Sequence, residues 1–497
     1  MTSPTDQKFG LTAKKNENFS EWYTQVITKG ELIEYYDLKG CIIMRPASMH
    51  IWNCIRKFFN EAIEKMGVEE TYFPMLVTRS AMEKEQNHVE NFAPELAWIT
   101  HCGDNALETP VAIRPTSEAI MYPTFSKWLR SHRDLPLQLN QWCNVLRWEV
   151  KSTTPFIRGR EFLWQEGHTA FLTREEADKN VLEILNLYER VYKEVLAVPV
   201  LKGRKSENEK FGGAEYTTSL EAFISGTGRA VQAATSHGLG QNFAKMFGIE
   251  VDTPQGNQFV FQNSWGLTTR SIGIAVMVHS DDAGLVLPPW VAQVQVVIVP
   301  CGITATTSQK DKSVLEEYTN SILKELKMEN IRAMIDDREN LTPGYKFNYW
   351  EIRGVPLRIE VGFRDLRAEE SRFVRRYDAK KWQVKRKGIG KETKEILKEI
   401  HENMFNKAKK ELEEGIVHPS TWDEFTTALN NKKIALIPWC NFCEEEIKNK
   451  TAVVNEDGTV AAMGAKSLCI PFDSKIDGVC INCGKEAKIK AYFGRSY

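Results

Sequence analysis

The 497-residue sequence contains no uninterrupted apolar run of about 18 residues, the length that a membrane-spanning helix needs. Its first residues, MTSPTDQKFGLTAKKNENF, lack the apolar core of a secretory signal peptide. A composition of 42% hydrophobic and 26% charged residues also argues against a disordered chain. We therefore expect a protein without membrane association that resides in the cytoplasm.

The sequence also has no excess of charge of either sign. Its 65 lysines and arginines face 66 aspartates and glutamates, so the formal net charge is −1. Such a chain does not attract nucleic acid as a whole, and any RNA contact has to come from local basic patches. The length exceeds what a single hydrophobic core supports, which indicates roughly two to four domains.

Cysteine is present in moderate number, with ten residues in a chain that we expect to be cytoplasmic. In that compartment, thiols or metal ligands are more common than disulfides. Five of the cysteines are scattered, and we interpret them as small buried hydrophobic residues: Cys41, Cys54, Cys102, Cys143 and Cys301.

The other five cysteines lie near the end of the chain. Two C-x-x-C pairs, Cys440 with Cys443 and Cys480 with Cys483, have the spacing with which two turns bring four thiolates onto one tetrahedral Zn²⁺. Four cysteine ligands leave no open position for water, so this pattern predicts a structural zinc ion. Cys469 is an alternative fourth ligand, although its apolar neighbours favour a buried structural residue. Free redox-active thiols are the other alternative.

In the first part of the chain, periodic patterns indicate an α+β domain. Apolar residues recur at helical spacing over 50–66, and Thr173 with Glu176 forms a capping box that opens a second helix. Strand-like runs follow at 217–224 and 258–264. These elements predict an antiparallel sheet with flanking helices.

Beyond a Leu-Pro-Pro stretch near residue 290, strands and helices alternate. Strand patterns at 293–302, 331–336 and 356–362 surround a helix that we expect over 313–328, with a capping box formed by Ser313 and Glu316. This alternation indicates a compact α/β domain with a largely parallel sheet. From Gly388 the sequence becomes helical and charged, and it ends in the cysteine-rich segment. We therefore expect domains at 1–290, 291–390 and 391–497.

The stretch from residue 140 to residue 168 is the most informative for function. We expect strands at 142–149 and 161–169, forming a hairpin that brings together Arg147, Glu149, Arg158 and Phe162. Guanidinium groups bind phosphate oxygens in pairs, a carboxylate accepts a hydrogen bond from an exocyclic amine, and a ring stacks on a base. The hairpin thus predicts a nucleoside triphosphate site. A surface hairpin with ordinary ion pairs is the alternative.

This hairpin resembles motif 2 of the class II aminoacyl-tRNA synthetases. GVEETYFPMLV (67–77) is similar to their motif 1, and SWGLTTRSIGIAVMVH (264–279), which contains Arg270, is similar to motif 3. IRPTSE (113–118), FLWQEGH (162–168) and ATSHGLGQNFAKMF (234–247) resemble blocks of the prolyl-tRNA synthetase family, of its archaeal/eukaryote-like type. The resemblance extends from about Phe19 to Tyr497.

The resemblance implies a class II antiparallel-sheet catalytic domain, an α/β anticodon-binding domain and a C-terminal zinc-binding α/β domain. It implies activation of L-proline with ATP and Mg²⁺ to prolyl-adenylate, followed by transfer to tRNA(Pro). It also implies a homodimer, because motif 1 forms the interface in this family. Only about a hundred residues separate Phe162 from Ser264, so we expect no editing domain in cis.

The resemblance also assigns the residues of the site. It gives Arg147 and Arg270 the catalytic roles, and it implies ATP contacts from Arg147, Glu149, Arg158, Phe162, Gln232, Thr268, Thr269 and Arg270. It implies proline contacts from Thr116, Glu118, Arg147, Trp164, Glu166, His168, Phe211, His237, Ser264 and Gly266, with Phe92 as a further candidate for the aromatic wall.

The segment 353–390 is rich in arginine and lysine with interleaved aromatic residues, a composition that suits single-stranded RNA loops. Arg358, Arg364 and Arg367 are candidates for RNA contact, and a solvated strand face is the alternative. Two other functions stay open: a sibling class II synthetase (threonyl, histidyl or glycyl) and a catalytically silent tRNA-binding paralogue. We also expect the terminal Tyr497 to dock near the catalytic domain.

Overall fold

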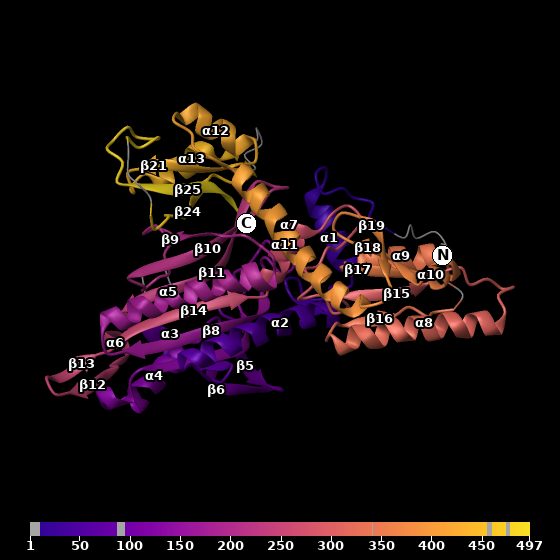
Figure 1. Ribbon diagram of the computed structural model, residues 1–497. Coiled ribbons are helices and arrows are strands. Elements are labelled where there is room, and N and C mark those ends of the chain that lie inside the picture. Colours follow the sequence, from indigo (N-terminus) through magenta and orange to yellow (C-terminus); the bar gives the residue numbers. More distant parts are fainter. Residues whose placement is uncertain (1–9, 87–94, 340, 455–459, 474–477) are drawn as a thin grey trace.

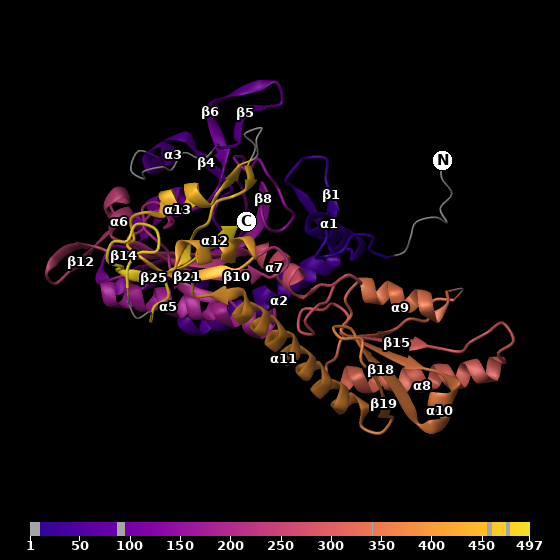
Figure 2. The same cartoon turned by 90° about the horizontal axis from the view of Figure 1, so that it is seen from above.

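The computed structural model describes residues 10–86, 95–339, 341–454, 460–473 and 478–497. Figure 1 shows three parts, namely a large sheet with covering helices, an α/β part to its right and a smaller C-terminal part above the sheet. The long helix α11 (Ile389–Gly415) connects the last two, and Figure 2 shows its path from above. Within the described ranges, no helix combines the length and the apolar character needed to cross a bilayer.

An eleven-stranded sheet forms the centre of the molecule. Its main path runs β20-β21-β25-β11-β14-β8-β7-β3, with β10 beside β11, β9 beside β10 and β24 beside β25. The strands from the first half of the chain pair antiparallel, as the sequence predicted, except that the short β3 runs parallel to β7. These strands are β3 (Glu69–Glu70), β7 (Leu137–Leu146), β8 (Glu161–Phe171), β9 (Leu201–Arg204), β10 (Tyr216–Ile224), β11 (Arg229–Gly240) and β14 (Phe261–Thr268).

Helices α2 (Pro46–Ile63), α5 (Arg174–Arg190) and α7 (Arg270–His279) contribute to the main hydrophobic core of this sheet. The predicted capping box opens α5, where the Thr173 side chain accepts a hydrogen bond from the N–H of Glu176. The buried rings of Phe59 on α2 and Tyr188 on α5 stack with centroids 5.0 Å apart. Each such ring contributes about 1.5–3 kcal/mol through burial. One face of the sheet is therefore covered by helices in the hydrophobic core.

The remaining elements of this part surround the sheet. They are α1 (Phe19–Lys29), β1 (Ile33–Tyr35), β2 (Ile42–Met44), η1 (Glu64–Met66), β4 (Leu76–Thr78), α3 (Arg79–Gln86), β5 (Trp98–Cys102), β6 (Asn105–Ile113), α4 (Glu118–Trp128), η2 (His132–Asp134), the π-helical η3 (Val191–Val195), α6 (Asn242–Phe247), β12 (Glu250–Thr253) and β13 (Gly256–Phe259). The structure describes all residues between Phe162 and Ser264, and they form no additional domain.

The α/β part contains a five-stranded sheet in the order β16-β15-β17-β18-β19. Its elements are β15 (Val296–Pro300), α8 (Gln309–Met328), β16 (Ala333–Ile335), α9 (Pro343–Ile352), β17 (Leu357–Val361), α10 (Phe363–Ala368), β18 (Glu370–Arg375) and β19 (Lys381–Lys385). The prediction of a largely parallel sheet was wrong for its second half, because β17–β18 and β18–β19 pair antiparallel. The link from β17 to β18 is too short for a parallel crossover, which needs about a dozen residues.

Helix α8 begins before the predicted residue 313. Its N-cap is Ser308, whose side chain accepts a hydrogen bond from the N–H of Asp311. The capping box expected at Ser313 and Glu316 was therefore wrong, because an equally suitable cap lies one and a half turns earlier in the chain.

The C-terminal part extends the central sheet, which the sequence did not predict. Strand β25 (Ile489–Ser496) pairs in parallel with the start of β11 through Arg229–Arg495 and Ala230–Ser496. Tyr497 then donates its N–H to the carbonyl of Ala230 at 3.1 Å, so the terminal residue docks on the first part, as expected. The other elements are β20 (Ile416–Val417), α12 (Trp422–Asn430), β21 (Ile434–Trp439), α13 (Glu444–Thr451), β22 (Val453–Val454), β23 (Val460–Ala462) and β24 (Lys466–Cys469).

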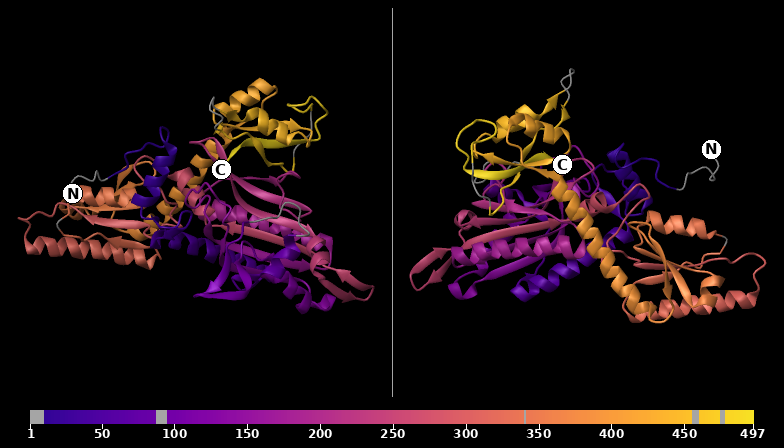
Figure 3. Two further views of the ribbon diagram at one scale, coloured as in Figure 1. Left: turned by 180° about the vertical axis from the view of Figure 1, so that it is seen from behind. Right: turned by 45° about the horizontal axis from the view of Figure 1, so that its top comes forward.

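Figure 3 shows from two other directions that the α/β part and the C-terminal part lie apart, with α11 between them. Helix α11 packs against both the α/β part and the region where the C-terminal part meets the central sheet. Ile396, Ile400 and Met404 pack in the core of the α/β part, whereas Leu412 packs with residues of β11 and β24. The boundary predicted at residue 390 thus lies at the start of a helix that both parts share.

The scattered cysteines are less buried than predicted. Cys41 is buried, but Cys54, Cys143 and Cys301 are only half-buried, and Cys102 is exposed. Cys102 lies at the tip of the β5–β6 hairpin, opposite Asn105. The interpretation of all five as core residues was therefore wrong.

Candidate active site and metal centre

A cavity of about 880 Å³ lies against the strands β8, β11 and β14. Alternation along β8 explains its lining. Gln165 points toward the packed face, where it bonds to Tyr188 of α5, so that Trp164, Glu166 and His168 point to the other face. The predicted residues that line this cavity are Thr116, Glu118, Arg147, Glu149, Arg158, Phe162, Trp164, Glu166, His168, Phe211, Gln232, His237, Ser264, Gly266, Thr268 and Arg270.

Gly167 permits this arrangement of β8. It stands between Glu166 and His168 with its missing side chain toward the packed face, where a Cβ would collide with the ring of Trp265. Glycine at this position lets the strand approach Trp265 closely while its neighbours reach into the cavity.

The hairpin that carries Arg147 differs from the predicted one at its end. Strand β7 ends at Leu146, opposite Glu161, rather than at residue 149. Arg147 still donates its main-chain N–H to the carbonyl of Arg160, but Glu149 lies in the connecting loop and is exposed. The strand was predicted too long because Trp148 continues the strand-like sequence pattern beyond Leu146, the last residue that pairs with β8.

Two half-buried guanidinium groups face the cavity without a carboxylate partner among the described residues. Arg147 donates Nε–H to the carbonyl of Pro115 at 3.2 Å, and its Cζ lies 5.4 Å from the ring centroid of Phe162. Arg270 donates to the carbonyls of Ile157 at 2.9 Å and Gln232 at 3.1 Å. Burial lowers the pKa of both arginines. Positive charge that the protein leaves unpaired in a cavity favours an anionic ligand.

A buried polar network forms one wall of the cavity. The carboxylate of Glu166 accepts hydrogen bonds from Ser117 at 2.5 Å and Gln141 at 2.8 Å, and it contacts His168 Nε2 at 3.0 Å. Burial opposes the charges of this pair, but their mutual contact prevails, so the pKa of Glu166 is lowered and that of His168 is raised. Nearby, the hydroxyl of Thr116 donates to the buried carboxylate of Glu118.

An aromatic wall stands beside this network. The ring of Phe211 lies 4.8 Å from the imidazole of His237. Thr217, on the neighbouring strand β10, contacts His237 Nδ1 at 2.8 Å and accepts the N–H of Phe211 at 2.9 Å. Burial lowers the pKa of His237 to about 3, so the imidazole is neutral. Ser264 lies opposite both His168 and His237 in the sheet.

One predicted contact, Thr269, falls outside this cavity. Thr269 is buried at the start of α7, where its N–H donates to the carbonyl of Leu163, and it lines a neighbouring hollow. Phe92 lies outside the described residues. Sequence reasoning also missed Thr217, because a threonine in a strand pattern gives no signal of its contacts across the sheet.

In the α/β part, the candidates for RNA contact separate into two kinds. Arg358 is largely buried, bonded to Glu360 at 3.0 Å and placed over the ring of Phe347, so it is unsuited to RNA contact. Arg364 and Arg367 are exposed on α10. One of the aromatic residues interleaved in that segment, Phe373, is fully buried in the core because it faces inward on β18.

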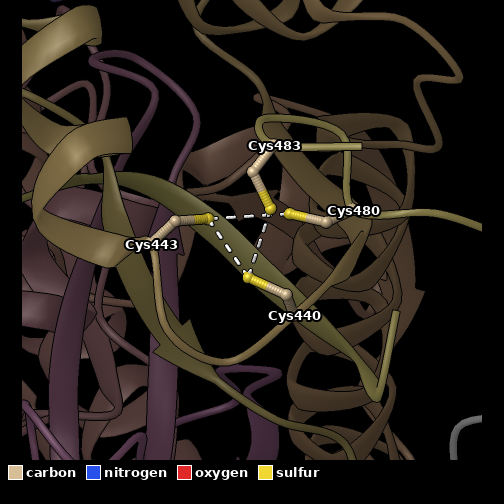
Figure 4. Close-up of side chains that lie close together, drawn as sticks. All are labelled: Cys440, Cys443, Cys480 and Cys483. Carbon is tan, nitrogen blue, oxygen red and sulfur yellow. Dashed lines mark hydrogen bonds between the residues drawn. The ribbon is translucent and has the colours of Figure 1, made fainter. Parts of the chain in front are cut away.

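The four C-x-x-C cysteines converge on one point, as Figure 4 shows. The Sγ atoms of Cys440 and Cys443 are 3.5 Å apart, and those of Cys443–Cys480 and Cys483–Cys440 are 3.6 Å apart. All four sulfurs lie within 4.8 Å of one another. A tetrahedron of Zn–S bonds of about 2.3 Å would place its sulfurs about 3.8 Å apart, so the donor set fits zinc. Cys469 is fully buried on β24 and is not a member of this cluster.

Fold and cavity together define a class II aminoacyl-tRNA synthetase. Residues 101–279 match the tRNA synthetase class II core domain (G, H, P, S and T), and residues 295–396 match an anticodon binding domain. Residues 422–497 match the prolyl-tRNA synthetase C-terminal domain. The chain belongs to the prolyl-tRNA synthetase family.

Individual relatives agree with this assignment. A proline–tRNA ligase of Encephalitozoon cuniculi is 59% identical over 498 residues, which cover 99% of each chain. A cytoplasmic proline–tRNA ligase of Arabidopsis thaliana is 52% identical over 98% of this chain and 91% of its own. A bifunctional glutamate/proline–tRNA ligase of Cricetulus griseus is 53% identical, and the match spans 33% of that longer protein.

Proposed function

We propose that the chain activates L-proline with ATP and transfers the prolyl group to tRNA(Pro). The observation that carries this proposal is the combination of two unpaired cavity arginines with a buried carboxylate–imidazole pair and an aromatic wall. The arginines suit a triphosphate, and the remaining wall suits a small cyclic ammonium ion. Family membership supports the same reaction, and it does not favour a sibling synthetase or a silent paralogue.

In the first step, a carboxylate oxygen of proline attacks the α-phosphorus of ATP and the bond to the β-phosphate oxygen breaks. The products are prolyl-adenylate and pyrophosphate. Negative charge builds on the equatorial oxygens, and we assign its stabilisation to Arg147 and Arg270, with Arg158 near the outer phosphates. We further assign Phe162 to stacking on adenine and Glu149 to its amino group, with Gln232, Thr268 and Thr269 nearby. Mg²⁺ accompanies ATP as part of the substrate.

The proline pocket has a negative and an aromatic side. The buried carboxylate of Glu118 and the hydroxyl of Thr116 suit the secondary ammonium group, while Trp164, Phe211 and His237 suit the ring. A cation against such rings gains about 1–2 kcal/mol when it is desolvated. The Glu166–His168 pair fixes the polar rim, together with Ser264 and Gly266.

In the second step, a terminal hydroxyl of tRNA attacks the carbonyl carbon of prolyl-adenylate, and AMP leaves. The exposed arginines of α10 suit the anticodon loop. We place the functional parts at 1–290, 291–390 and 391–497. We also propose a cytoplasmic homodimer, and three exposed apolar residues in the motif 1 segment support such an interface, namely Tyr72, Met75 and Leu76.

Amino-acid-dependent ATP–pyrophosphate exchange with all twenty amino acids tests the proposal without tRNA. We expect exchange with proline far above any other amino acid, alanine included. Exchange with another amino acid would keep the scaffold and overturn the pocket. No exchange with any amino acid would favour the silent tRNA-binding paralogue.

We propose that the cysteine cluster holds one structural Zn²⁺, which would link the two C-x-x-C turns when bound. Its ligands would be Cys440, Cys443, Cys480 and Cys483. Cys440→Ser is expected to lower the zinc content below stoichiometric and to reduce the thermal unfolding midpoint. Metal analysis of the purified variant checks this, with Cys102→Ser as the control. Full zinc retention in the Cys440 variant would contradict the ligand assignment.

A further inference from the structure

A buried chain of hydrogen bonds joins the metal centre to the proposed proline pocket. Glu444 follows the ligand Cys443 and is the first residue of α13. Its side chain is buried, and its carboxylate accepts the hydroxyl of Ser206 at 2.8 Å and the N–H of Ser467 at 2.9 Å. Ser206 lies in the loop between β9 and β10, so this contact crosses from the C-terminal part to the catalytic part.

The loop continues this chain toward the pocket. The N–H of Lys205, directly before Ser206, donates to the carbonyl of Thr217 at 2.8 Å. The hydroxyl of Thr217 accepts the N–H of Phe211 and shares a second hydrogen bond with Nδ1 of His237. These two bonds tie the orientation of the Thr217 hydroxyl to both residues.

Further contacts bind the same loop to the C-terminal part. The ammonium group of Lys205 donates to the carbonyl of Leu468 at 2.7 Å and pairs with buried Glu221 at 2.7 Å. Glu209 pairs with Lys466 at 2.6 Å. The hydroxyl groups of Ser206 and Ser467 are 2.9 Å apart. The loop is therefore bound to β24 and α13 in addition to its contacts within the catalytic part, such as the hydrogen bond from Asn242 Nδ2 to the carbonyl of Gly213 at 2.9 Å.

Among the residues of this hydrogen-bond series, Glu444 is the one whose displacement costs the most free energy. A buried carboxylate costs several kcal/mol unless donors surround it, so its position is coupled to those of Ser206 and Ser467. When four thiolates share one metal ion, the backbone at Cys443 is fixed, and Glu444 is fixed with it. The ion, when bound, would add to the contacts that already join α13 to the loop bearing Cys480, such as the hydrogen bond from Lys450 Nζ to Asn482 Oδ1 at 3.0 Å.

We propose that Glu444 is a positioning residue for the proline pocket, which transmits the geometry of the metal centre through Ser206 to Phe211 and His237. The inference rests on the proposed function, because it takes these two rings as the wall of the proline site. It makes metal loading a determinant of proline affinity, although the cysteine cluster lies outside the catalytic cavity.

Steady-state exchange kinetics of the full-length variants test the proposal. Ser206→Ala removes the hydrogen bond to Glu444 and the one shared with the Ser467 hydroxyl. It is expected to raise KM for proline about five-fold, with kcat and KM for ATP within about two-fold. Glu444→Ala removes both hydrogen bonds that the carboxylate accepts and is expected to raise KM for proline about ten-fold, and Glu444→Gln, which keeps one acceptor, less. The double variant is expected to match Glu444→Ala, because both changes break one link.

The matched control is Glu445→Ala, which removes a neighbouring acid whose side chain is exposed and paired with Lys448. It is expected to behave as the unaltered protein. A second readout is independent of activity: amide hydrogen exchange at Phe211 is expected to accelerate in Ser206→Ala and Glu444→Ala. Chelation of the metal is expected to produce the same acceleration, and to add little in Ser206→Ala.

Phe211→Ala and His237→Gln distinguish the possible failures. If these two raise KM for proline but Ser206→Ala and Glu444→Ala leave both KM and exchange at Phe211 unchanged, the positioning role of Glu444 is wrong and the pocket stands. If Phe211→Ala and His237→Gln also leave KM for proline unchanged, the pocket assignment fails, and the inference fails with it.

Discussion

In the catalytic cavity, the guanidinium groups of Arg147 and Arg270 have no carboxylate partner among the described residues, whereas those of Arg375 and Arg376 in the anticodon-binding domain are paired with carboxylates. Arg375 bonds to Asp378 at 2.6 Å and to Glu399 at 2.9 Å, and Arg376 bonds to Asp281 at 2.6 Å. Burial lowers the pKa of the cavity arginines, while the hydrogen bond to Asp378 raises the pKa of Arg375.

The difference separates two uses of the same side chain. A paired arginine has its charge neutralised inside the protein and contributes to the structure. An unpaired arginine in a cavity is held at a cost that an anionic substrate removes, and that interaction strengthens as charge develops in the transition state. Sequence alone assigns both kinds the same charge.

The strongest test of this comparison is Arg147→Ala. It should lower proline-dependent ATP–pyrophosphate exchange by about 10²–10³-fold, because a fixed cation is lost where negative charge develops. Thermal stability should change little, since no carboxylate loses its partner. Exchange kinetics and tRNA binding on the same preparation check this. An equal loss of tRNA binding and exchange would indicate a structural role for Arg147.

The converse test is Arg376→Ala, which leaves the carboxylate of Asp281 without its partner. We expect a loss of about 2 kcal/mol of stability, seen as a lower unfolding midpoint, with exchange at 25 °C nearly unchanged. Lys381→Ala, at an exposed position on β19, is the control. An unchanged midpoint in Arg376→Ala would show that pairing does not make this arginine structural.

A smaller effect should distinguish the exposed arginines of α10. Arg364→Ala and Arg367→Ala should each weaken tRNA binding a few-fold and reduce the slope of log K against log salt by about 0.7–0.9 if each meets one phosphate. Arg358→Ala should leave that slope unchanged, because its charge is paired with Glu360. Binding titrations at several salt concentrations measure these slopes. An equal slope for all three variants and the unaltered protein would exclude phosphate contacts from α10.

The smallest expected effect near neutral pH concerns the two cavity histidines, whose pKa values are shifted in opposite directions. Because the pKa of His168 is raised, its stabilisation is present below about 6.5 and is lost as pH rises through its folded pKa. Because the pKa of His237 is lowered to about 3, its contribution is present above about 6.5 and is lost as pH falls from there toward 3. His168→Gln should flatten the alkaline slope of the unfolding midpoint, and His237→Gln the acid slope. Identical slopes in both variants would contradict this.

Several features of the fold followed from local patterns. The capping box at Thr173 and Glu176 opens α5 because side-chain and main-chain groups three residues apart satisfy one another. The two C-x-x-C pairs converge because each turn presents both of its thiols on one side. Where two local signals competed, as at Ser308 and Ser313, the sequence did not decide between them.

Other features depend on contacts that no local pattern contains. The end of β7 at Leu146, the antiparallel second half of the anticodon-binding sheet and the pairing of β25 with β11 are set by neighbouring strands. The roles of Thr217 and Glu444 depend on partners from distant segments. From the sequence alone, Thr217 is a threonine within a strand pattern and Glu444 is a glutamate of the kind usually found on the surface.

Short motifs fix residue type and spacing, and they were enough to predict the family, the order of the three parts, the four clustered cysteines and a set of site residues nearly all of which line the cavity. Folding was needed to show which arginines stay unpaired, which strand joins the C-terminal part to the catalytic sheet and which side chains connect the metal centre to the pocket. Pairing and burial are properties of segments brought together by folding, and they are set by the whole core.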